Sequence, residues 1–567
     1  MSIALAVPLL TSLALTFAIE ALLRPIVAPF WRRLPATLAV HLGSGLLLFA
    51  LFLLVLQRPW FAVVFIASLQ LVVVQSSNTK SATLKEPFIC QDFEYFLDAV
   101  KHPRLYVPFF GIRLAVAATT AGAMAIAAFL WLEPSLLSRH GPAALLVPVG
   151  FLLLMSAALL LPGLKYLPAC HLEPHDDLHR LGLFASLWSY GRLALKPLPA
   201  DALKTPFAAV SPSPDTAPLG LPHLVVVQSE SFFDPREWSE LVPDDLLSHF
   251  DALKQSALRQ GPLRVPAWGA NTVRTEAAFL TGLPPEALGI HRFTPYRQFT
   301  RSPIATLPSR LRELGYRTVC VHPYPASFYL RHKVIPRLGF DDFLDIRHFD
   351  AADRDGQYVG DRAVAKKVGT LLDDSDNRPL FVFAITMENH GPLHLERPLP
   401  DDAPRLPGVA AKRLKAEEIA DLRIYLRHLC NADAMLGRIR AKLTPTEPGS
   451  RHGMLCWYGD HVPIMSGAYR RLGEPSGDTC YALWSSRHQT TANAQESAEP
   501  LDVSELGMAI FEALLQDASR HEPPHDATVG GDGDGSGRHK GLDDVPQNNV
   551  PQNNDAVGQT QSHQEQE

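Results

Sequence analysis

The sequence lacks the features of a nucleic-acid-binding protein and of a thiol-based site. Its 52 basic and 58 acidic residues give a net charge of −6, and no basic patch with interleaved aromatic residues is present, which argues against a nucleic-acid partner. The six cysteines show no metal or redox spacing, and Cys320 and Cys456 lie in apolar runs that predict core thiols. Charged residues make up only 19% of the chain and hydrophobic residues 47%, so a wholly soluble protein is not expected.

Basic residues are also missing from the N-terminal end, where a cleavable signal peptide would carry them. Five apolar runs come close to the roughly 20 residues that a helix needs to cross a bilayer. They are residues 3–23, 36–56, 60–74, 114–132 and 143–161, of which the third is the shortest. The sequence therefore predicts a retained α-helical transmembrane bundle of about five spans in residues 1–165, integral to the membrane.

The loop charges bear on the orientation of this bundle. Basic residues follow the first and third spans, whereas the alternate loops offer mainly Arg58 and Arg139. Under the positive-inside rule, the C-terminal part of the chain would then lie in the cytoplasm. A re-entrant or missed span would reverse this result, so the loop charges alone leave the orientation open.

Three further regions follow the spans. Residues 166–222 are expected to hold an amphipathic juxtamembrane helix over 176–195 and a proline-rich linker over 211–222. Residues 223–518 alternate apolar strand-like runs (224–227, 317–321, 380–385) with helical stretches (304–314, 416–443, 501–515), which indicates an α/β domain with a mainly parallel sheet and helices on both faces. Residues 519–567, rich in Gly, Asp, Asn and Gln, are expected to be a disordered tail.

Polar side chains follow each predicted strand of this domain. Glu230 follows the first, His322 the second, His390 the third, and Asp460 with His461 the apolar run that ends at Gly459, a residue expected to allow a tight turn. Ligands bind beyond the carboxyl ends of parallel strands, so these side chains are expected to meet. Each alone could be a surface residue or a satisfied core histidine, and the Asp-His pair a plain turn. Together they suit a divalent cation of the Zn²⁺ or Mn²⁺ kind.

A hydroxyl nucleophile is offered by the segment Trp268 to Glu276, which reads as a glycine-bearing turn that opens a helix. A hydroxyl at a helix start meets free N–H groups and the positive end of the dipole, where a phosphate can be held. Beside a cation it can be deprotonated near neutral pH and attack phosphorus. The alternative is that Asn271 or Thr272 serves only as an N-cap.

These motifs together resemble the lipoteichoic acid synthase and phosphoglycerol transferase family of the alkaline phosphatase–sulfatase superfamily. The resemblance rests on residues 228–232, Asn271-Thr272 followed by Glu276, His322 with Phe328 and Arg331, residues 386–392, and residues 458–461. It covers nearly the whole chain, including five spans before the catalytic domain. Two departures are Val273-Arg274-Thr275, where the family often has Ser-Asp-Ser, and Tyr329, where it has Trp.

The resemblance implies roles for individual residues. It makes Glu230, Thr272, Asp460 and His461 ligands of one divalent metal ion, commonly Mn²⁺, with Zn²⁺ or Mg²⁺ as alternatives, and makes Thr272 the nucleophile as well. His322 and Arg331 would contact the substrate, the arginine by gripping phosphoryl oxygens. His390 would bind the head group or relay a proton.

The resemblance further implies the reaction and its place in the cell. A lipid head group, phosphoglycerol from phosphatidylglycerol, would pass through a phospho-threonine to an extracytoplasmic glycan or polymer. The protein would lie in the bacterial cytoplasmic membrane with its catalytic domain facing the periplasm or the exterior, against the loop charges. A phosphoethanolamine transferase, a sulfatase or phosphodiesterase, and a non-enzymatic binding module remain as alternatives.

Overall fold

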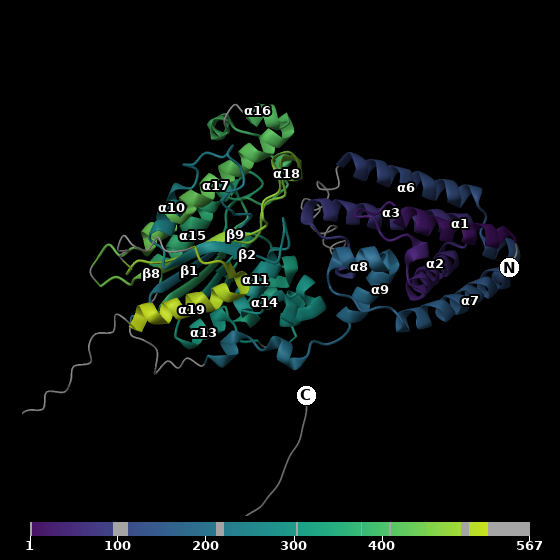
Figure 1. The fold of residues 1–567 in the computed structure, drawn as a ribbon, viewed down its shortest axis with the longest axis horizontal. Coiled ribbons are helices and arrows are strands. Elements are labelled where there is room, and N and C mark those ends of the chain that lie inside the picture. Colours follow the sequence, from purple (N-terminus) through teal and green to yellow (C-terminus); the bar gives the residue numbers. More distant parts are fainter. Residues whose placement is uncertain are drawn as a thin grey trace, which may run out of the picture. The chain divides into compact units, whose positions relative to one another are not determined.

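The computed structural model describes residues 3–94, 112–210, 220–301, 304–375, 377–406, 410–447, 449–488 and 498–519. Within these ranges the N-terminal part contains the helices α1 (Ile3–Glu20), α2 (Pro35–Leu56), α3 (Pro59–Leu84), α6 (Ile112–Leu132) and α7 (Leu136–Lys165) (Figure 1). Helices α1, α2, α3 and α7 are long and apolar enough to cross a membrane, and α6 contributes a shorter apolar stretch, Thr119–Leu132. Four of the five predicted spans are thus confirmed by length and composition, and the remaining run is helical.

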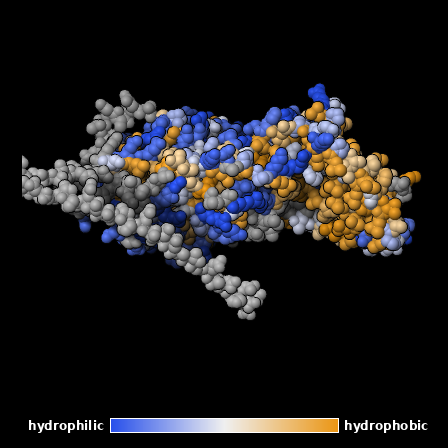
Figure 2. All heavy atoms as spheres, turned by 90° about the horizontal axis from the view of Figure 1, so that it is seen from below, coloured by the Kyte–Doolittle hydropathy of each residue, from blue (hydrophilic) through white to orange (hydrophobic). Residues whose placement is uncertain are grey.

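Apolar side chains cover the outside of these helices. Among the described residues, every exposed large hydrophobic side chain lies between Ile3 and Leu195 except Leu395 and Leu399. Figure 2 shows them gathered into one broad apolar surface, whereas most of the remaining surface is hydrophilic. An apolar surface of this extent is incompatible with water contact, so the protein is membrane-anchored.

Small residues bring α2 and α7 together. A Cβ atom on Gly43 of α2 would lie 2.7 Å from Leu160 Cγ, and one on Gly163 of α7 would lie 3.1 Å from the Val40 backbone nitrogen. Ser156 Oγ also donates a 2.7 Å hydrogen bond to the Gly43 carbonyl. Close backbone approach at glycines is a common way for membrane helices to pack.

The third helix is longer than its apolar run. The run ends at Val74, but α3 continues to Leu84 through a polar stretch, residues 75–84, called here the polar extension of α3. At 1.5 Å per residue this extension adds about 15 Å. The apolar pattern thus located the span but not the end of the helix.

The predicted single juxtamembrane helix over 176–195 is wrong. Two helices occupy this region, α8 (Pro174–Leu181) and α9 (Leu183–Ala194), and they are separated at Gly182, whose φ is +77°. The break lets Leu183 N–H donate a 2.6 Å hydrogen bond to Glu20 Oε1, and Glu20 also pairs with Arg33 at 2.7 Å. A Cβ atom on Gly182 would collide with Arg33, so this contact with the bundle requires glycine.

The C-terminal part is built on an eight-stranded sheet in the order β10-β2-β9-β8-β1-β7-β3-β4 (Figure 1). Strands β8, β1, β7, β3 and β4 are mutually parallel, and β9 is antiparallel to β8 and β2. The strand bounds are β1 His223–Ser229, β2 Arg259–Arg264, β3 Arg317–Val321, β4 Asp342–Leu344, β7 Leu380–Ile385, β8 Gly453–Gly459, β9 Thr479–Ser485 and β10 Leu501–Asp502. The predicted mainly parallel sheet is confirmed.

Helices cover both faces of this sheet, as predicted. Val225 and Val227 of β1 face the core beneath α10 (Ser248–Gln255), α15 (Asp361–Asp373) and α17 (Ala416–Leu443). Leu224 and Val226 face the opposite core beneath α11 (Thr272–Thr281), α13 (Leu307–Glu313) and α19 (Val503–Ser519). This alternation follows from the two-residue period of a strand whose two faces are both buried.

The remaining sequence predictions have different outcomes. The last predicted helix, 501–515, begins later and ends later as α19, because Leu501 and Asp502 pair with β2 as strand β10. Most of the predicted linker and nearly all of the predicted tail lie outside the described residues. Cys320 and Cys456 are free, fully buried core thiols, which confirms that prediction.

Candidate metal centre and active site

The four strands with polar ends are neighbours in the sheet, in the order β8, β1, β7 and β3. Ser229 pairs with Gly459, Gln228 with Ile385, and Ala384 with Val321. The residues that follow these positions therefore emerge along one edge of the sheet. Strand ends far apart in the chain thus deliver carboxylate and imidazole groups to a common place, as the parallel arrangement requires.

Glu230, Asp460 and His461 form a compact, buried donor cluster. Each offers one ligand atom, and these atoms lie within 4.8 Å of one another. His461 Nε2 lies 3.5 Å from Glu230 Oε1 and 3.3 Å from Asp460 Oδ2, yet neither Nε2 nor Oδ2 has a hydrogen-bond partner. The other imidazole nitrogen of His461, Nδ1, donates to the Val462 carbonyl at 3.1 Å, so the lone pair of Nε2 is free to bind a cation.

The electrostatics of this cluster also favour a cation. Burial, and after it the charge of Asp460, raise the pKa of Glu230 to about 8. Two neighbouring buried carboxylates repel one another unless positive charge is supplied. Two carboxylates and one imidazole suit Zn²⁺ or Mn²⁺, so the residues present fit the predicted metal.

Gly459 is needed for a different reason than predicted. It does not open a turn in the left-handed region but ends strand β8 in register with Ser229. A Cβ atom at this position would lie 1.7 Å from the Phe232 carbonyl oxygen. The glycine lets the loop after β1 approach closely enough for Ser231 N–H to donate a 2.8 Å hydrogen bond to Asp460 Oδ1.

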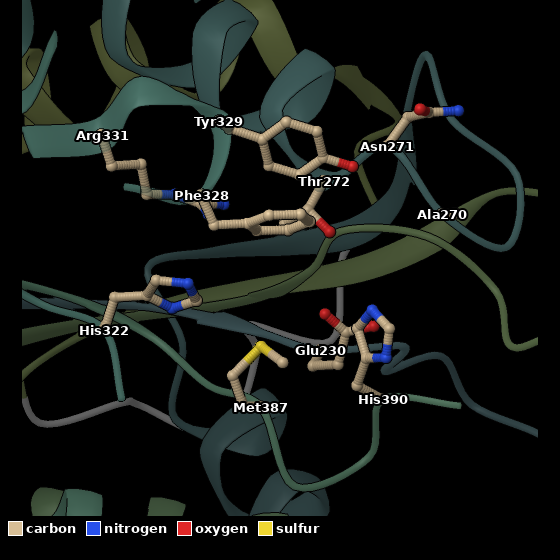
Figure 3. A pocket seen from close by; sticks show the side chains of 10 residues that line it. All are labelled: Glu230, Ala270, Asn271, Thr272, His322, Phe328, Tyr329, Arg331, Met387 and His390. Carbon is tan, nitrogen blue, oxygen red and sulfur yellow. The ribbon is translucent and has the colours of Figure 1, made fainter. Parts of the chain in front are cut away.

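Thr272 is the first residue of α11, and Asn271 precedes it with a φ of +68°. Thr272 and Glu230 line the same pocket, together with His322, Arg331 and His390 (Figure 3). The hydroxyl therefore sits at the N-terminus of a helix, beside the donor cluster, where partial positive charge favours an anion. This placement is what the sequence predicted for a nucleophile.

Two histidines present neutral nitrogens to this pocket. His322 Nδ1 donates to the Ile385 carbonyl at 3.1 Å and His390 Nδ1 donates to the Gly391 carbonyl at 2.7 Å, so each ring keeps Nε2 as an acceptor. Burial lowers the pKa of both rings, that of His322 strongly. Each is therefore a neutral imidazole near pH 7, able to accept a proton or a hydroxyl hydrogen bond.

Arg331 is fixed by a buried ion pair. Its Nε donates to Glu276 Oε2 at 3.1 Å, its Nη2 contacts Glu276 Oε1, and the Tyr296 hydroxyl donates to Glu276 Oε2 at 2.6 Å. Arg331 Nη1 is buried with no hydrogen-bond partner, and the side chain lines the pocket. Although burial lowers the arginine pKa, Glu276 raises it further, so the guanidinium stays charged and offers one free edge to an oxyanion.

The three residues that depart from the family pattern after Thr272 do not line the pocket. Val273 lies in the core, and Thr275 Oγ1 donates to the Asp460 carbonyl at 2.9 Å. Arg274 pairs with Glu86 through two contacts of 2.9 and 3.1 Å. Tyr329, in contrast, does line the pocket, across from His322 and Met387 in Figure 3.

All seven predicted site residues thus come together. Glu230, Asp460 and His461 form the donor cluster, and Thr272, His322, Arg331 and His390 line the adjoining pocket. The sequence motifs assigned no role to Glu276. Its spacing of four residues from Thr272 nevertheless places both residues on one face of a helix. Tyr358, whose hydroxyl donates to the Gly391 carbonyl at 3.2 Å beside His390, had no such signal.

Comparison with known families agrees with this geometry. The family model described as Sulfatase matches residues 222–513, more than half of the chain. The chain therefore belongs to the sulfatase family.

The chain is similar to two proteins of the bacterium Rhizobium meliloti. The chain is 31% identical over 259 residues to the capsular polysaccharide biosynthesis protein RkpI of Rhizobium meliloti (strain 1021), covering 45% of this chain and 44% of that protein. It is 26% identical over 293 residues to a putative cyclic beta-1,2-glucan modification protein of the same strain, covering 51% and 41%. The chain thus spans less than half the length of these two relatives.

Among solved structures, the phosphoglycerol transferase GacH of Streptococcus pyogenes, in complex with sn-glycerol-1-phosphate, is similar with a TM-score of 0.42. The sequence identity is 22%, and the match covers 57% of this chain and 79% of that chain.

Proposed function

We propose that this protein is a membrane-anchored, metal-dependent phosphotransferase that moves a lipid head group to an extracytoplasmic glycan or polymer. The observation that carries the proposal is the placement of the Thr272 hydroxyl at a helix N-terminus, in one pocket with Glu230 and beside the unpaired Asp460 Oδ2 and His461 Nε2. A hydroxyl nucleophile, a cation site and a free arginine edge are the parts that phosphoryl transfer needs.

The first half-reaction would load the enzyme. The Thr272 oxygen attacks the phosphorus of the donor lipid while its hydroxyl proton passes to neutral His390, the bond from phosphorus to the diacylglycerol oxygen breaks, and His390 returns that proton to the departing diacylglycerol oxygen. Arg331 Nη1, buried and unpaired in the pocket, would bind a non-bridging phosphoryl oxygen as charge develops. A divalent cation held by Glu230, Asp460, His461 and Thr272 would lower the pKa of the threonine hydroxyl and offset the charge on phosphorus oxygens.

The second half-reaction would return the enzyme to its starting state. A hydroxyl of the acceptor glycan attacks the same phosphorus, and the bond from phosphorus to the Thr272 oxygen breaks. His390, neutral and with Nε2 available, would take the proton from that hydroxyl and pass it to the departing Thr272 oxygen. His322 Nε2, buried and without a partner, would accept a hydrogen bond from a hydroxyl of the head group. Ping-pong kinetics should follow.

The motif resemblance and the names of the relatives support a particular donor and a particular class of acceptor. The motif resemblance favours phosphoglycerol from phosphatidylglycerol as the transferred group and Mn²⁺ as the metal, with Zn²⁺ or Mg²⁺ as alternatives. The names of the two curated relatives, which refer to polysaccharide biosynthesis and to glucan modification, support a glycan acceptor. Such acceptors lie outside the cytoplasm, so we place the protein in the cytoplasmic membrane with residues 223–518 facing the periplasm or the exterior.

A phosphoethanolamine transferase is the second candidate, because the same threonine and donor cluster would serve it. A sulfatase activity is disfavoured, since that chemistry needs a Cys or Ser at the nucleophile position for conversion to formylglycine, and Thr272 cannot supply it. A binding module without catalysis is disfavoured by the unpaired donor atoms of Asp460 and His461.

The test uses the full-length protein in detergent with Mn²⁺ and a soluble oligosaccharide acceptor. Phosphatidylglycerol and phosphatidylethanolamine, each labelled in the head group, are supplied separately, and released diacylglycerol and labelled acceptor are measured. We expect phosphatidylglycerol to be consumed, Thr272→Ala to release no diacylglycerol, and the matched control Thr370→Ala, an exposed threonine on α15, to behave as wild type. A Thr272→Ala protein that still releases diacylglycerol would overturn the proposal.

A further inference from the structure

The end of α3 lies against the loops that carry the nucleophile and the metal ligands. A Cβ atom on Gly269, in the loop before Thr272, would lie 3.3 Å from both Leu84 Cδ2 and the Thr83 carbonyl oxygen. Lys85 Nζ lies 5.6 Å from the ring centre of Trp268. The polar extension of α3 therefore reaches the turn from which α11 begins.

The segment after Asp460 and His461 meets the same end of α3. Ser466 Oγ donates to the Ala82 carbonyl at 3.3 Å, and Lys85 forms an exposed ion pair with Glu474. Both loops of the candidate site thus contact residues 82–86, which belong to the membrane-anchored part of the chain.

A buried charge network joins this segment to α11. Arg274, in the first turn of α11, pairs with Glu86 through Nη1 at 2.9 Å and Nη2 at 3.1 Å. Glu86 is also bound by Lys80 of the polar extension, and Lys80 binds Asp92 of η2 (Cys90–Asp92) at 2.7 Å. The four side chains are only 5–12% exposed.

The two basic partners of Glu86 keep its carboxylate ionised. Burial alone would raise its pKa, but Arg274 and Lys80 outweigh burial and lower the pKa of Glu86 to about 2. The carboxylate is therefore ionised throughout the neutral and mildly acidic range. A charge-assisted, bidentate contact of this kind fixes both distance and orientation.

The sign of the charge on Arg274 explains why it needs this partner. A cation in the first turn of a helix opposes the positive end of the helix dipole. Arg274 is also two residues from Thr272, so an uncompensated guanidinium there would be attracted to the phosphoryl group and pull on the start of the helix. Glu86 neutralises the arginine and holds it outside the pocket, which it does not line.

We propose that Glu86, a residue of the membrane-anchored part, is a positioning residue that sets the Thr272 hydroxyl through Arg274. The effect of Glu86 on the rate of head-group transfer rests on the proposed function. The segment that follows α3 then completes the site. The catalytic domain, residues 223–518, reaches its full kcat only when that segment packs against α11.

The test compares Glu86→Gln, Arg274→Gln and the double variant as full-length proteins in detergent, with phosphatidylglycerol and Mn²⁺. A small displacement of a reacting group can cost about 100-fold in rate, so we expect each single variant to lower kcat by about 100-fold while KM changes little. Because the two residues act as one unit, the double variant should lose no more than either single variant. The charge-reversed pair, E86R with R274E, should regain part of kcat. Glu474→Gln, which removes an exposed ion pair between Lys85 and the segment after Asp460 and His461, is the matched control and should behave as wild type.

Hydrogen exchange supplies a readout that does not depend on the reaction. In Glu86→Gln, amides of residues 268–276 should exchange faster, whereas those of strand β8 should not change. Wild-type kcat in Glu86→Gln, losses that multiply in the double variant, or unchanged exchange over 268–276 would each overturn the inference. A wild-type protein that transfers no head group would instead overturn the proposed function, and the exchange measurement would still decide on the positioning.

Discussion

Replacing Glu276 with alanine should both destabilise the catalytic domain and impair transfer. Glu276 is fully buried and accepts hydrogen bonds from Arg331 and from the Tyr296 hydroxyl, and the Arg331 side chain is itself only 2% exposed. Removing one partner of a buried ion pair leaves an uncompensated charge, at a cost of about 3–5 kcal/mol. For a domain of this size, that loss corresponds to a fall in melting temperature of roughly 6–10 °C.

A double variant separates the structural from the chemical role of this pair. Apolar replacement of both partners, Glu276→Leu with Arg331→Met, should recover much of the lost stability, because no buried charge remains. It should still fail to transfer, because the free guanidinium edge in the pocket is gone. Thermal unfolding followed by intrinsic fluorescence and head-group transfer are measured on the same samples. An unchanged melting temperature in Glu276→Ala would contradict the structural role of the pair, and wild-type transfer by the double variant would contradict the role of Arg331 in transfer.

Three further predictions concern the metal, the proton and the backbone. Chelation should abolish transfer and Mn²⁺ should restore it, while Glu230→Gln and Asp460→Asn proteins should contain less metal by elemental analysis, because both carboxylates belong to the buried donor cluster. Because burial lowers the pKa of His390, the neutral ring persists as pH falls, so its acid limb in a pH–rate profile should lie below the ordinary histidine value of about 6.5 and be absent in His390→Asn. Gly459→Ala should unfold at a markedly lower temperature because its Cβ would collide with the Phe232 carbonyl, whereas Gly369→Ala on α15, which has open space, should not.

The sequence located the site because each piece of it has a local signature. An apolar run that ends in a polar residue marks both a buried strand and its carboxyl end, and this was enough to bring Glu230, His322, His390 and Asp460 to one edge of the sheet. These residues then lie close together because the carboxyl ends of neighbouring parallel strands lie at the same edge of the sheet. The bounds of β3, β7 and α17 also match their apolar patterns.

What the sequence could not predict are features made by contacts between distant segments. Glu276 and Arg331 are 55 residues apart, and Glu86 and Arg274 are 188 apart, so no spacing links them. The break at Gly182 reflects docking on Glu20 and Arg33 rather than a local turn pattern. The polar extension of α3 carries no apolar periodicity because its side chains contact charged groups, as Lys80 does with Glu86 and Asp92. Gly459 was identified, but the reason for it, the Phe232 carbonyl of the loop after β1, is again a tertiary contact.

A trapping experiment can show whether Thr272 carries the transferred group. The full-length protein with Mn²⁺ is mixed with phosphatidylglycerol in the absence of acceptor, quenched in acid, and digested for mass spectrometry. We predict a glycerophosphoryl group on Thr272, released when a glycan acceptor is added before the quench. Diacylglycerol release in step with transfer, but with Thr272 unmodified at every time point, would contradict it.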